Sequence, residues 1–376
     1  MMKQYDVCII AFVDIATDAR TLNISGTFAK FGYSVAVIGL NNIELTAASN
    51  VDFFGFQISN TKRTWQRWLE FHKKASSIIK TINTKNVFAE DIYSLPIASK
   101  LVKQNNAQLI YDSREIYSAI GPLSGKSFKQ KFISFTEKKY IKNVSKIIVT
   151  AERDAKYLYQ HLTNKIEYIT IKNLPPYKEK LNTDIIRKKF GIPSHKKIVI
   201  YQGMLLKGRG IKKTIEAVSI LKNTVFVILG DGPLRNTLEQ IIENKNLKEK
   251  IFLAGAIEYD KLHEWTCSAD LGITLIEPIS KSYELALPNK LFEYIMARIP
   301  SLCTNLLAMK EITDKYNTGK YINYNLPPSQ IAQIIKDLLV SQTQYITNCD
   351  KAAHILSFEK QNEELLNCTN LNKKGR

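Results

Sequence analysis

The sequence predicts an α/β fold built from two Rossmann-like, doubly wound domains. Short apolar runs alternate with helix-period segments along nearly the whole chain, as in parallel sheets flanked by helices. The length of 376 residues suits two cores of middling size. The double proline within Asn173–Lys180 cannot continue a helix or a central strand, so it predicts a linker. We therefore expect domains at 1–172 and 173–350, followed by a C-terminal segment at 351–376.

The first domain is expected to alternate strands and helices from its first residues. The predicted strands are Val7–Phe12, Ser34–Leu40, Asn86–Ala89, Gln108–Asp112, Ser145–Thr150 and Ile166–Ile171. A helix at Thr21–Phe31 follows the first strand, and Gly32-Tyr33 turns the chain into the second.

The alternation begins again after a short predicted helix at Asp184–Phe190. The expected strands are Lys197–Gln202, Thr224–Leu229, Ile251–Ala254, Leu271–Leu275 and Ser301–Thr304. Ligands of such sheets bind beyond the carboxyl ends of the strands, and two facing domains would place the site in the cleft between them. The helical period of His354–Leu366 predicts a final helix.

The formal net charge of +18 favours nucleic acid, an anionic membrane surface or a phosphate-rich substrate as partner. A bias towards Lys, Ile and Asn would also explain the charge without a function. No apolar run approaches the roughly 20 residues that span a bilayer. The N-terminus lacks the layout of a signal peptide, and the five cysteines are scattered without a CxxC pair, so we expect a reducing cytoplasm and no structural metal.

Two glycine-containing loops follow predicted strands of the second domain. The first begins at Gly203 and contains Lys207 and Arg209, so its backbone can approach an anion that the two cations neutralise. The second is Gly230-Asp231-Gly232, a tight turn from strand to helix. Each loop alone is explained equally well by a structural turn, but their joint occurrence in one domain favours a binding site.

A third motif, Pro288-Asn289-Lys290, opens a predicted helix. Asn289 is a good N-cap residue, and the N-terminus of a helix suits a phosphate. Lys290 adds a positive charge at the same end. Glu293, one turn further along, is suited to the hydroxyls of a ribose. The motif therefore predicts half of a pocket for a nucleoside diphosphate.

In this order and spacing, residues 197–305 resemble the nucleotide-binding domain of the retaining GT-B glycosyltransferases of family 4 (glycosyl transferases group 1), in particular bacterial members with a PNKxxEY helix. The resemblance implies a GT-B fold whose last helix crosses back to the first domain. It implies that Arg209 stabilises the leaving diphosphate, that Glu293 contacts the ribose, and that the backbone of Asn289 and Lys290 meets the diphosphate. It implies no metal and no cofactor beyond the nucleotide sugar.

The sequence departs from the family pattern at three places. The first glutamate of the Glu-x7-Glu pattern falls on Leu285, with Glu284 beside it as the candidate to orient the sugar. The arginine usual after the first glycine is Met204, so Lys207 is expected to supply the second charge. A glycine that often follows the helix is Arg298.

The first domain resembles the family more loosely and supplies candidates for the acceptor side. Asp18 is expected to cap the first helix, and Arg20 to reach into the cleft. Asp91 and Asp112 follow or close strands. Arg114 stands where related enzymes often have a histidine beside the reacting sugar, so no catalytic histidine transfers. Arg114 is a candidate for binding a sugar hydroxyl or an acceptor phosphate, and each of these side chains is also compatible with a purely structural role.

Two segments of the first domain, Thr61–Lys85 and Lys126–Lys146, concentrate basic residues among aromatic ones. Phe128, Phe132 and Phe135 are spaced to share a helix face. Taken alone, this stripe is expected to pack on the sheet while the lysines face water. Taken with the nucleotide pocket, the basic segments predict an anionic membrane surface as partner and a peripheral location at the inner face of the cell membrane.

The resemblance thus implies a retaining, metal-independent hexosyltransferase of polysaccharide and cell-envelope biosynthesis. It would move a sugar from a nucleotide-diphosphate sugar to a lipid-linked or surface-polysaccharide acceptor. Two alternatives stay open. A GT-B-fold nucleotide-sugar epimerase would share the pocket but need no separate acceptor. A non-catalytic, basic nucleic-acid-binding protein would explain the charge, but leaves the Pro-Asn-Lys helix unexplained.

Overall fold

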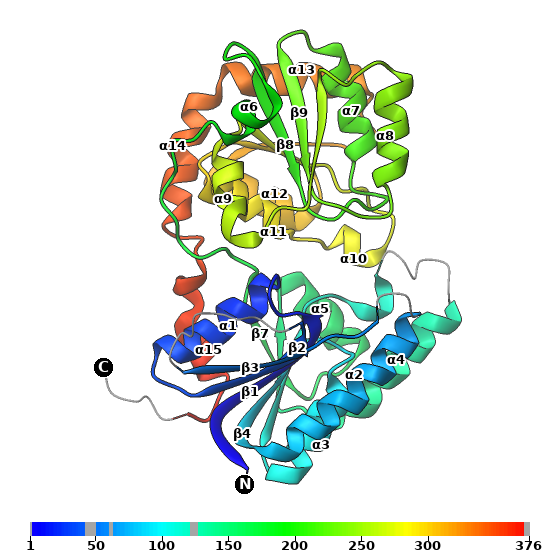
Figure 1. Ribbon diagram of the computed structural model, residues 1–376, viewed down its shortest axis with the longest axis vertical. Helices are drawn as coiled ribbons and strands as arrows, with labels where there is room; N and C mark the ends of the chain where they lie inside the picture. The colour runs from blue at the N-terminus through cyan, green and yellow to red at the C-terminus, as the bar shows by residue number, and fades with distance from the viewer. Residues whose placement is uncertain (1, 42–49, 60–62, 121–126, 372–376) are drawn as a thin grey trace. The chain divides into compact units, whose positions relative to one another are not determined.

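The computed structural model describes residues 2–41, 50–59, 63–120 and 127–371, and the chain divides into two compact units. The first unit extends to Asn173 and takes in the chain again from Phe358, and the second is Leu174–Ser357. In Figure 1 each unit contains a sheet with helices packed against it. The predicted α/β class with two Rossmann-like parallel sheets is confirmed.

The first unit contains a seven-stranded sheet in the order β3-β2-β1-β4-β5-β6-β7, and every neighbouring pair is parallel. Its strands are β1 (Lys3–Asp14), β2 (Val35–Leu40), β3 (Val51–Phe56), β4 (Ile82–Ala89), β5 (Gln108–Ser113), β6 (Lys146–Val149) and β7 (Glu167–Thr170). The chain goes from β1 outward to β2 and β3, and from β4 outward through β5 to β7. The carboxyl ends of β1 and β4 therefore form the topological switch point of this sheet.

The helices of the first unit are α1 (Ala19–Lys30), α2 (Thr64–Ile78), α3 (Leu95–Asn105), α4 (Ser127–Tyr140), α5 (Glu152–His161) and α15 (Asn362–Asn367). Short 3₁₀ turns lie at Ile79–Thr81, Tyr117–Ala119, Ile141–Asn143 and Phe358–Gln361. The prediction of one continuous helix at His354–Leu366 is wrong. The segment contains a 3₁₀ turn at Phe358–Gln361, and α15 begins only after it. The expected return of the C-terminal helix is confirmed: Thr27 of α1 bonds Asn362 of α15 at 3.2 Å, and Lys172 N donates to Gln361 at 2.7 Å.

The second unit contains a six-stranded parallel sheet in the order β10-β9-β8-β11-β12-β13. Its strands are β8 (Lys197–Gln202), β9 (Thr224–Leu229), β10 (Ile251–Gly255), β11 (Leu271–Thr274), β12 (Ser301–Thr304) and β13 (Gly319–Ile322). Its helices are α6 (Ile185–Phe190), α7 (Ile211–Ile220), α8 (Arg235–Asn244), α9 (Tyr259–Cys267), α10 (Lys281–Glu284), α11 (Asn289–Met296), α12 (Leu307–Tyr316), α13 (Pro328–Val340) and α14 (Gln342–Ala353).

Strand β8 shows why the second sheet is covered on both faces. Its residues alternate between two buried clusters, with Val199 and Tyr201 in one and Ile198 and Ile200 in the other. Successive side chains of a strand point to opposite faces, so a strand that is apolar at every position requires a core on each side. This arrangement leaves the carboxyl ends of the strands, where the loops turn into helices, as the place for polar groups.

Candidate functional site

Two loops at the carboxyl ends of β8 and β9 interlock through glycines. Gly203, Gly230 and Gly232 all have positive φ, at 122°, 139° and 151°. A Cβ atom on Gly230 would lie 2.0 Å from the carbonyl oxygen of Gly203, and one on Gly232 would lie 2.9 Å from the backbone N of Leu205. Leu205 N also donates to the carbonyl of Asp231 at 2.9 Å. Both the backbone conformation and the close approach require glycine here.

The first loop continues into a second tight contact, with the segment before α10. A Cβ on Gly208 would lie 2.5 Å from Cδ1 of Ile279, and the amide of Glu277 donates to the carbonyl of Gly208 at 2.9 Å. Arg209, in the middle of this loop, places its guanidinium 4.5 Å from the ring centroid of Tyr283. This cation–π contact orients Arg209 without neutralising its charge.

Lys290 lies beside the same loop. Its side chain is buried, and its Nζ lies 3.7 Å from the ring centroid of Tyr201. Burial, followed by the nearby Arg209, lowers the pKa of Lys290 well below its usual value. No carboxylate in the described part of the chain lies within ion-pair distance of Lys290 or Arg209. Glu293, beyond ion-pair distance, opposes this lowering. Two neighbouring basic side chains with no carboxylate in ion-pair contact form a site suited to an anion, which would favour the protonated form of Lys290.

Helix α11 contributes its N-terminus to this site, with one correction to the expected cap. Pro288 is the N-cap and Asn289 is the first helical residue, so the prediction that Asn289 caps the helix is wrong. The fixed φ of proline, here −76°, already sets the extended conformation that an N-cap requires. Asn289 is exposed, and the first-turn N–H groups of the helix have no capping side chain. A phosphate oxygen is a suitable partner for such groups.

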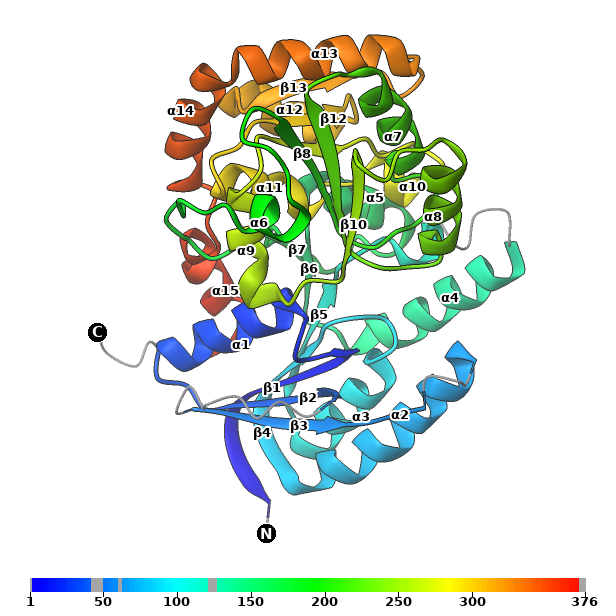
Figure 2. The ribbon, with the colours of Figure 1, turned by 45° about the horizontal axis from the view of Figure 1, so that its top comes forward.

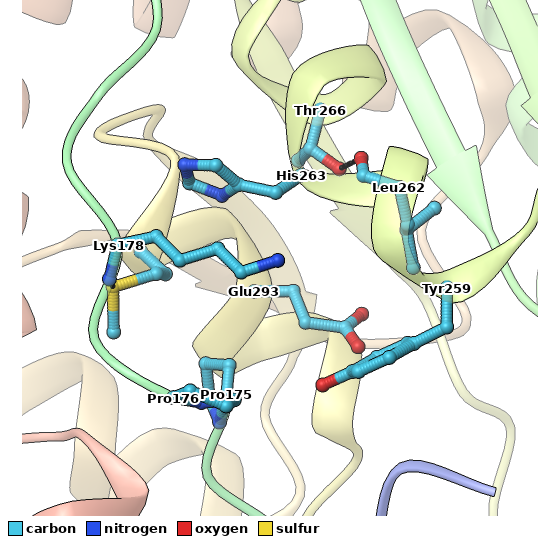
Figure 3. Close-up of a pocket in the computed structure, with 9 residues that line it drawn as sticks. Pro175, Pro176, Lys178, Tyr259, Leu262, His263, Thr266 and Glu293 are labelled. Atoms are coloured by element: carbon cyan, nitrogen blue, oxygen red, sulfur yellow. Dashed lines mark hydrogen bonds between the residues drawn. The ribbon is translucent and has the colours of Figure 1, made fainter. Parts of the chain in front are cut away.

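Glu293 is held by a short chain of hydrogen bonds on the next turn of α11. Gln202, the last residue of β8, donates from its Nε2 to Oε2 of Glu293, and Thr266 of α9 donates to Oε1 of Gln202 at 2.8 Å. Burial raises the pKa of Glu293, while the bond from Gln202 opposes the rise. Figure 3 shows the Glu293 carboxylate pointing into a small pocket that Tyr259 and Lys178 also line. The oriented carboxylate can accept hydrogen bonds from hydroxyl groups.

Sequence reasoning missed Tyr201, Gln202 and Tyr283, although their positions gave a signal. Tyr201 and Gln202 are the last two residues of a strand that runs into the glycine loop, where side chains meet a ligand. Buried polar residues at such a strand end are expected to be hydrogen-bonded. Here Gln202 donates to Glu293, and the Tyr201 hydroxyl donates to the carbonyl of Met204.

Lys207 and Glu284, two other predicted site residues, lie at the surface of the second unit. Lys207 is exposed. Glu284 is more than half exposed and accepts from Lys281 at 2.7 Å. Arg298, which replaces a glycine of the family pattern, has a φ of 56° and a buried side chain that bonds Asp350 at 3.0 Å. The left-handed backbone explains why a glycine is usual there.

In the first unit, Arg20 is a buried structural residue. The sequence led us to expect that it reaches into the cleft, but its side chain is held inside the first unit. Its guanidinium bonds both carboxylate oxygens of Asp112, at 2.5 and 2.8 Å, and also donates to the carbonyl of Ile171 and the side chain of Asn173. Arg20 is 5% exposed and Asp112 is 0% exposed. The bidentate pair therefore fixes α1 to β5 and to the chain that leaves β7.

Arg114 and Asp18 do come together, around a glutamate that sequence reasoning missed. Arg114 donates to both oxygens of Asp18, at 2.8 and 2.5 Å, and to Oε2 of Glu90 at 2.5 Å. Asp18 caps α1 as predicted, accepting from the amide of Thr21. Glu90 is fully buried, and burial raises its pKa to about 7 although Arg114 opposes the rise. This charged cluster lies at the switch point of the first sheet.

Asp91, next to Glu90, has a structural role. One carboxylate oxygen accepts from the amide of Phe12 at 2.6 Å and the other from the amide of Ser94 at 2.7 Å. These bonds tie the end of β4 to β1 and shape the turn that enters α3. The first unit thus places Asp18 and Arg114 in one cluster, while Arg20, Asp91 and Asp112 maintain its framework.

Comparison with characterised proteins gives partial matches to named glycosyltransferases. TuaC of Bacillus subtilis, whose name gives it as a glycosyltransferase of teichuronic acid biosynthesis, is 26% identical over 132 residues, which are 35% of this chain and 30% of TuaC. The alpha-D-kanosaminyltransferase of Streptomyces kanamyceticus is 27% identical over 139 residues, 36% of this chain and 34% of that enzyme. The chain therefore spans about a third of the length of each of these relatives.

Solved structures match over nearly the whole chain and share its fold. Sucrose-phosphate synthase from Thermosynechococcus elongatus has a TM-score of 0.78 at 13% identity, covering 96% of this chain and 98% of the other. The structure of Anabaena Alr3699/HepE in complex with UDP-glucose has a TM-score of 0.73 at 14% identity, with coverage of 96% and 98%. At these identities the likeness concerns the fold, which is GT-B.

The family comparison falls on the unit that carries the glycine loops and α11. Its matched segment begins in the strand-free stretch before α6 and ends just after α14. It includes Gly203, Arg209, Lys290 and Glu293. Residues 182–355 of the second unit thus match the family Glycosyl transferases group 1.

Proposed function

We propose that the chain is a retaining, metal-independent glycosyltransferase that uses a nucleotide-diphosphate sugar. The observation that carries the proposal is the pair of basic side chains, Arg209 and Lys290. They are held beside an interlocked glycine loop, and no carboxylate of the described residues lies within ion-pair distance of them. The family match of residues 182–355 supports the reaction class. The names of TuaC and the kanosaminyltransferase support it as well.

In this proposal the cations stabilise the negative charge that develops on the departing diphosphate. Arg209 and Lys290 are oriented in advance by Tyr283 and Tyr201, so little reorganisation is needed when the charge forms. The N-terminus of α11 adds its backbone N–H groups. Glu293, oriented by Gln202, would bind the ribose hydroxyls. A metal ion is not required in this scheme because two side chains and a helix terminus supply the positive charge.

We propose a lipid-linked or surface-polysaccharide hydroxyl as acceptor, with the enzyme in the cytoplasm and peripheral at the inner face of the membrane. TuaC is named for teichuronic acid biosynthesis, which supports a polysaccharide acceptor. Among the described residues, none of the helices has the length and apolar character needed to span a bilayer. TuaC and the kanosaminyltransferase are both named as transferases, and this favours transfer over the epimerase alternative.

The donor site is tested first by a thermal-shift panel of UDP, GDP, ADP and CDP in the presence of EDTA. A ligand at about 100 times its dissociation constant adds about 2.7 kcal/mol to stability, so the donor nucleotide should stand out. One clear shift that EDTA does not abolish supports a metal-independent pocket. A shift that appears only when EDTA is replaced by a divalent cation would contradict metal independence.

The role of Arg209 is tested by release of the diphosphate from the matching nucleotide sugar, with UDP-glucose as the first probe. Loss of one donor to a developing oxyanion costs roughly 100- to 1,000-fold in rate, so Arg209→Ala should lose activity by about that factor. Lys336→Ala, which removes an exposed cation on α13, is the matched control. Near-normal turnover of Arg209→Ala would overturn the assignment, and conversion of the sugar without acceptor would indicate an epimerase.

A further inference from the structure

The outward face of α4 exposes three phenylalanines. Phe128, Phe132 and Phe135 are 83%, 60% and 67% exposed, at a spacing that places them on one side of the helix. The expectation that this stripe packs on the sheet is therefore wrong. An exposed run of large aromatic side chains on an otherwise ordinary domain marks a surface that contacts something else.

The other side of α4 is anchored, so the helix cannot turn to bury these rings without breaking its own contacts. Glu137 is 3% exposed and accepts a hydrogen bond from the hydroxyl of Tyr111 in β5 at 2.8 Å. Ile141, directly after the helix, is buried as well. The inner face therefore belongs to the core of the first unit, and the phenylalanine face is a stable surface.

The charges on the outward side of α4 are all positive. Lys129, Lys131, Lys138 and Lys139 are exposed, and Glu137, which faces the interior, is the single acid in Ser127–Tyr140. Aromatic rings and lysines thus share one helix surface. This combination is typical of a helix that lies in the interface of an anionic bilayer, with rings in the acyl region and ammonium groups near the phosphates.

The same character extends across the neighbouring helices. In Figure 1 and Figure 2, α2, α3 and α4 lie together against the sheet of the first unit. On α2, Trp65 and Leu69 are 56% and 52% exposed. Among the described residues of these three helices, Glu70 is the one acid besides Glu137, and it pairs with Lys74 at 3.3 Å. Lys62 and Lys126, which the sequence also places in these basic segments, lie outside the described residues.

We propose that the outward face of α4 is a docking surface for an anionic lipid bilayer. Charge complementarity selects this occupant. A second copy of the chain would bring like charges together, and a wholly apolar partner would leave the lysines without a counter-charge. The inference deepens the proposed function, because it names the surface that would bring the enzyme to a membrane-linked acceptor.

The experiment is co-sedimentation of the full chain with vesicles of phosphatidylcholine, with and without phosphatidylglycerol. Three variants are compared with the wild type. The first replaces Phe128, Phe132 and Phe135 with Ser. The second replaces Lys129, Lys131 and Lys139 with Gln. The control replaces the exposed Lys222, Lys336 and Lys351 of the second unit with Gln, which lowers the net charge equally.

Binding of the wild type is expected only with phosphatidylglycerol. The affinity of the α4 lysine variant should fall by about fivefold per lysine, and that of the phenylalanine variant by roughly tenfold or more, while the control stays close to wild type. Circular dichroism should show all three variants folded, since only exposed side chains change. Protection of α4 from hydrogen exchange on vesicles gives a second readout without substitutions.

Three outcomes would overturn the proposal: no binding to anionic vesicles, equal losses in the control and α4 variants, or binding to single-stranded DNA in place of vesicles. The nucleotide thermal shift of the α4 variants is measured in parallel. If an α4 variant loses vesicle binding but keeps the nucleotide thermal shift, the membrane surface is distinct from the proposed donor site. Failure of the membrane proposal can thus be told apart from failure of the proposed function.

Discussion

Glu137 gives the first unit a stability that depends on pH, and Glu137→Gln should remove that dependence. The pKa of Glu137 is raised from its usual 4.5 to about 7, because the carboxyl group is buried beneath α4. The folded protein therefore holds this proton at pH values where the unfolded chain has lost it. Stability is fullest below about pH 4.5 and falls as the pH rises towards 7.

The size of the effect follows from the shift. One pKa unit corresponds to about 1.4 kcal/mol, so ionised Glu137 costs about 3 kcal/mol at pH 8 and under about 1 kcal/mol at pH 5. Glutamine keeps an oxygen that can accept from Tyr111 and does not ionise. The stability of the variant relative to the wild type should therefore rise by about 2 to 3 kcal/mol between about pH 5 and pH 8.

Urea unfolding followed by pulsed hydrogen exchange and mass spectrometry would report the two units separately at each pH. Glu152→Gln, which changes an exposed glutamate of the same unit, is the control. Its free energy of unfolding should differ from that of the wild type by the same amount at pH 5 and pH 8. If Glu137→Gln differs from the wild type by the same amount at pH 5 and pH 8, the carboxyl group is not held protonated by the fold. An ionised Glu137 in the folded protein would be at odds with its burial on the inner face of α4.

Two further predictions concern the donor site. Gly230→Ala places a Cβ 2.0 Å from the carbonyl of Gly203 at a φ of 139°, so the second unit should be destabilised by several kcal/mol, seen as a lower Tm, whereas an unchanged Tm would contradict the interlock. Lys290, whose pKa is lowered chiefly by burial, should take up a proton when a nucleoside diphosphate binds, so affinity should weaken as the pH rises. Calorimetry in buffers of different ionisation enthalpy should detect that proton in the wild type and not in Lys290→Met, and equal uptake in both would exclude Lys290 as its source.

The sequence predicted most of the strands because their ends are marked locally. β8, β9 and β12 have the predicted bounds, since glycine, proline or polar residues flank each apolar run. β3 and β13 were missed: Val51–Phe56 has aspartate and glycine within it, and Gly319–Ile322 contains a lysine and is short. An edge strand such as β3 is less completely covered by the rest of the unit than a central strand. Its run of apolar residues is therefore less regular and harder to recognise in the sequence.

Side-chain partners far apart in the chain could not be predicted. Arg20 and Asp112 are 92 residues apart, and neither has a local signal that distinguishes a buried pair from two ligand-binding groups. The phenylalanine stripe of α4 is a second feature that the sequence could not fully predict. Periodicity indicates which residues share a helix face, but the direction of that face is decided by the anchor on the opposite side, here Glu137 and Tyr111.

The interlocked glycines have a consequence for how the specificity of the proposed donor site can change. Gly203, Gly230 and Gly232 fix the two loops against each other through backbone atoms, so the loop that carries Arg209 has a fixed backbone path without a ligand. Substitutions that alter its path are blocked by steric overlap, and a preorganised loop loses little entropy on binding. A change of nucleotide or sugar in a protein with this fold should therefore come from substituted side chains around these loops, while the backbone of the loops stays the same. Glu284 and Lys207 are exposed, so substitutions at these positions would disturb no buried contact.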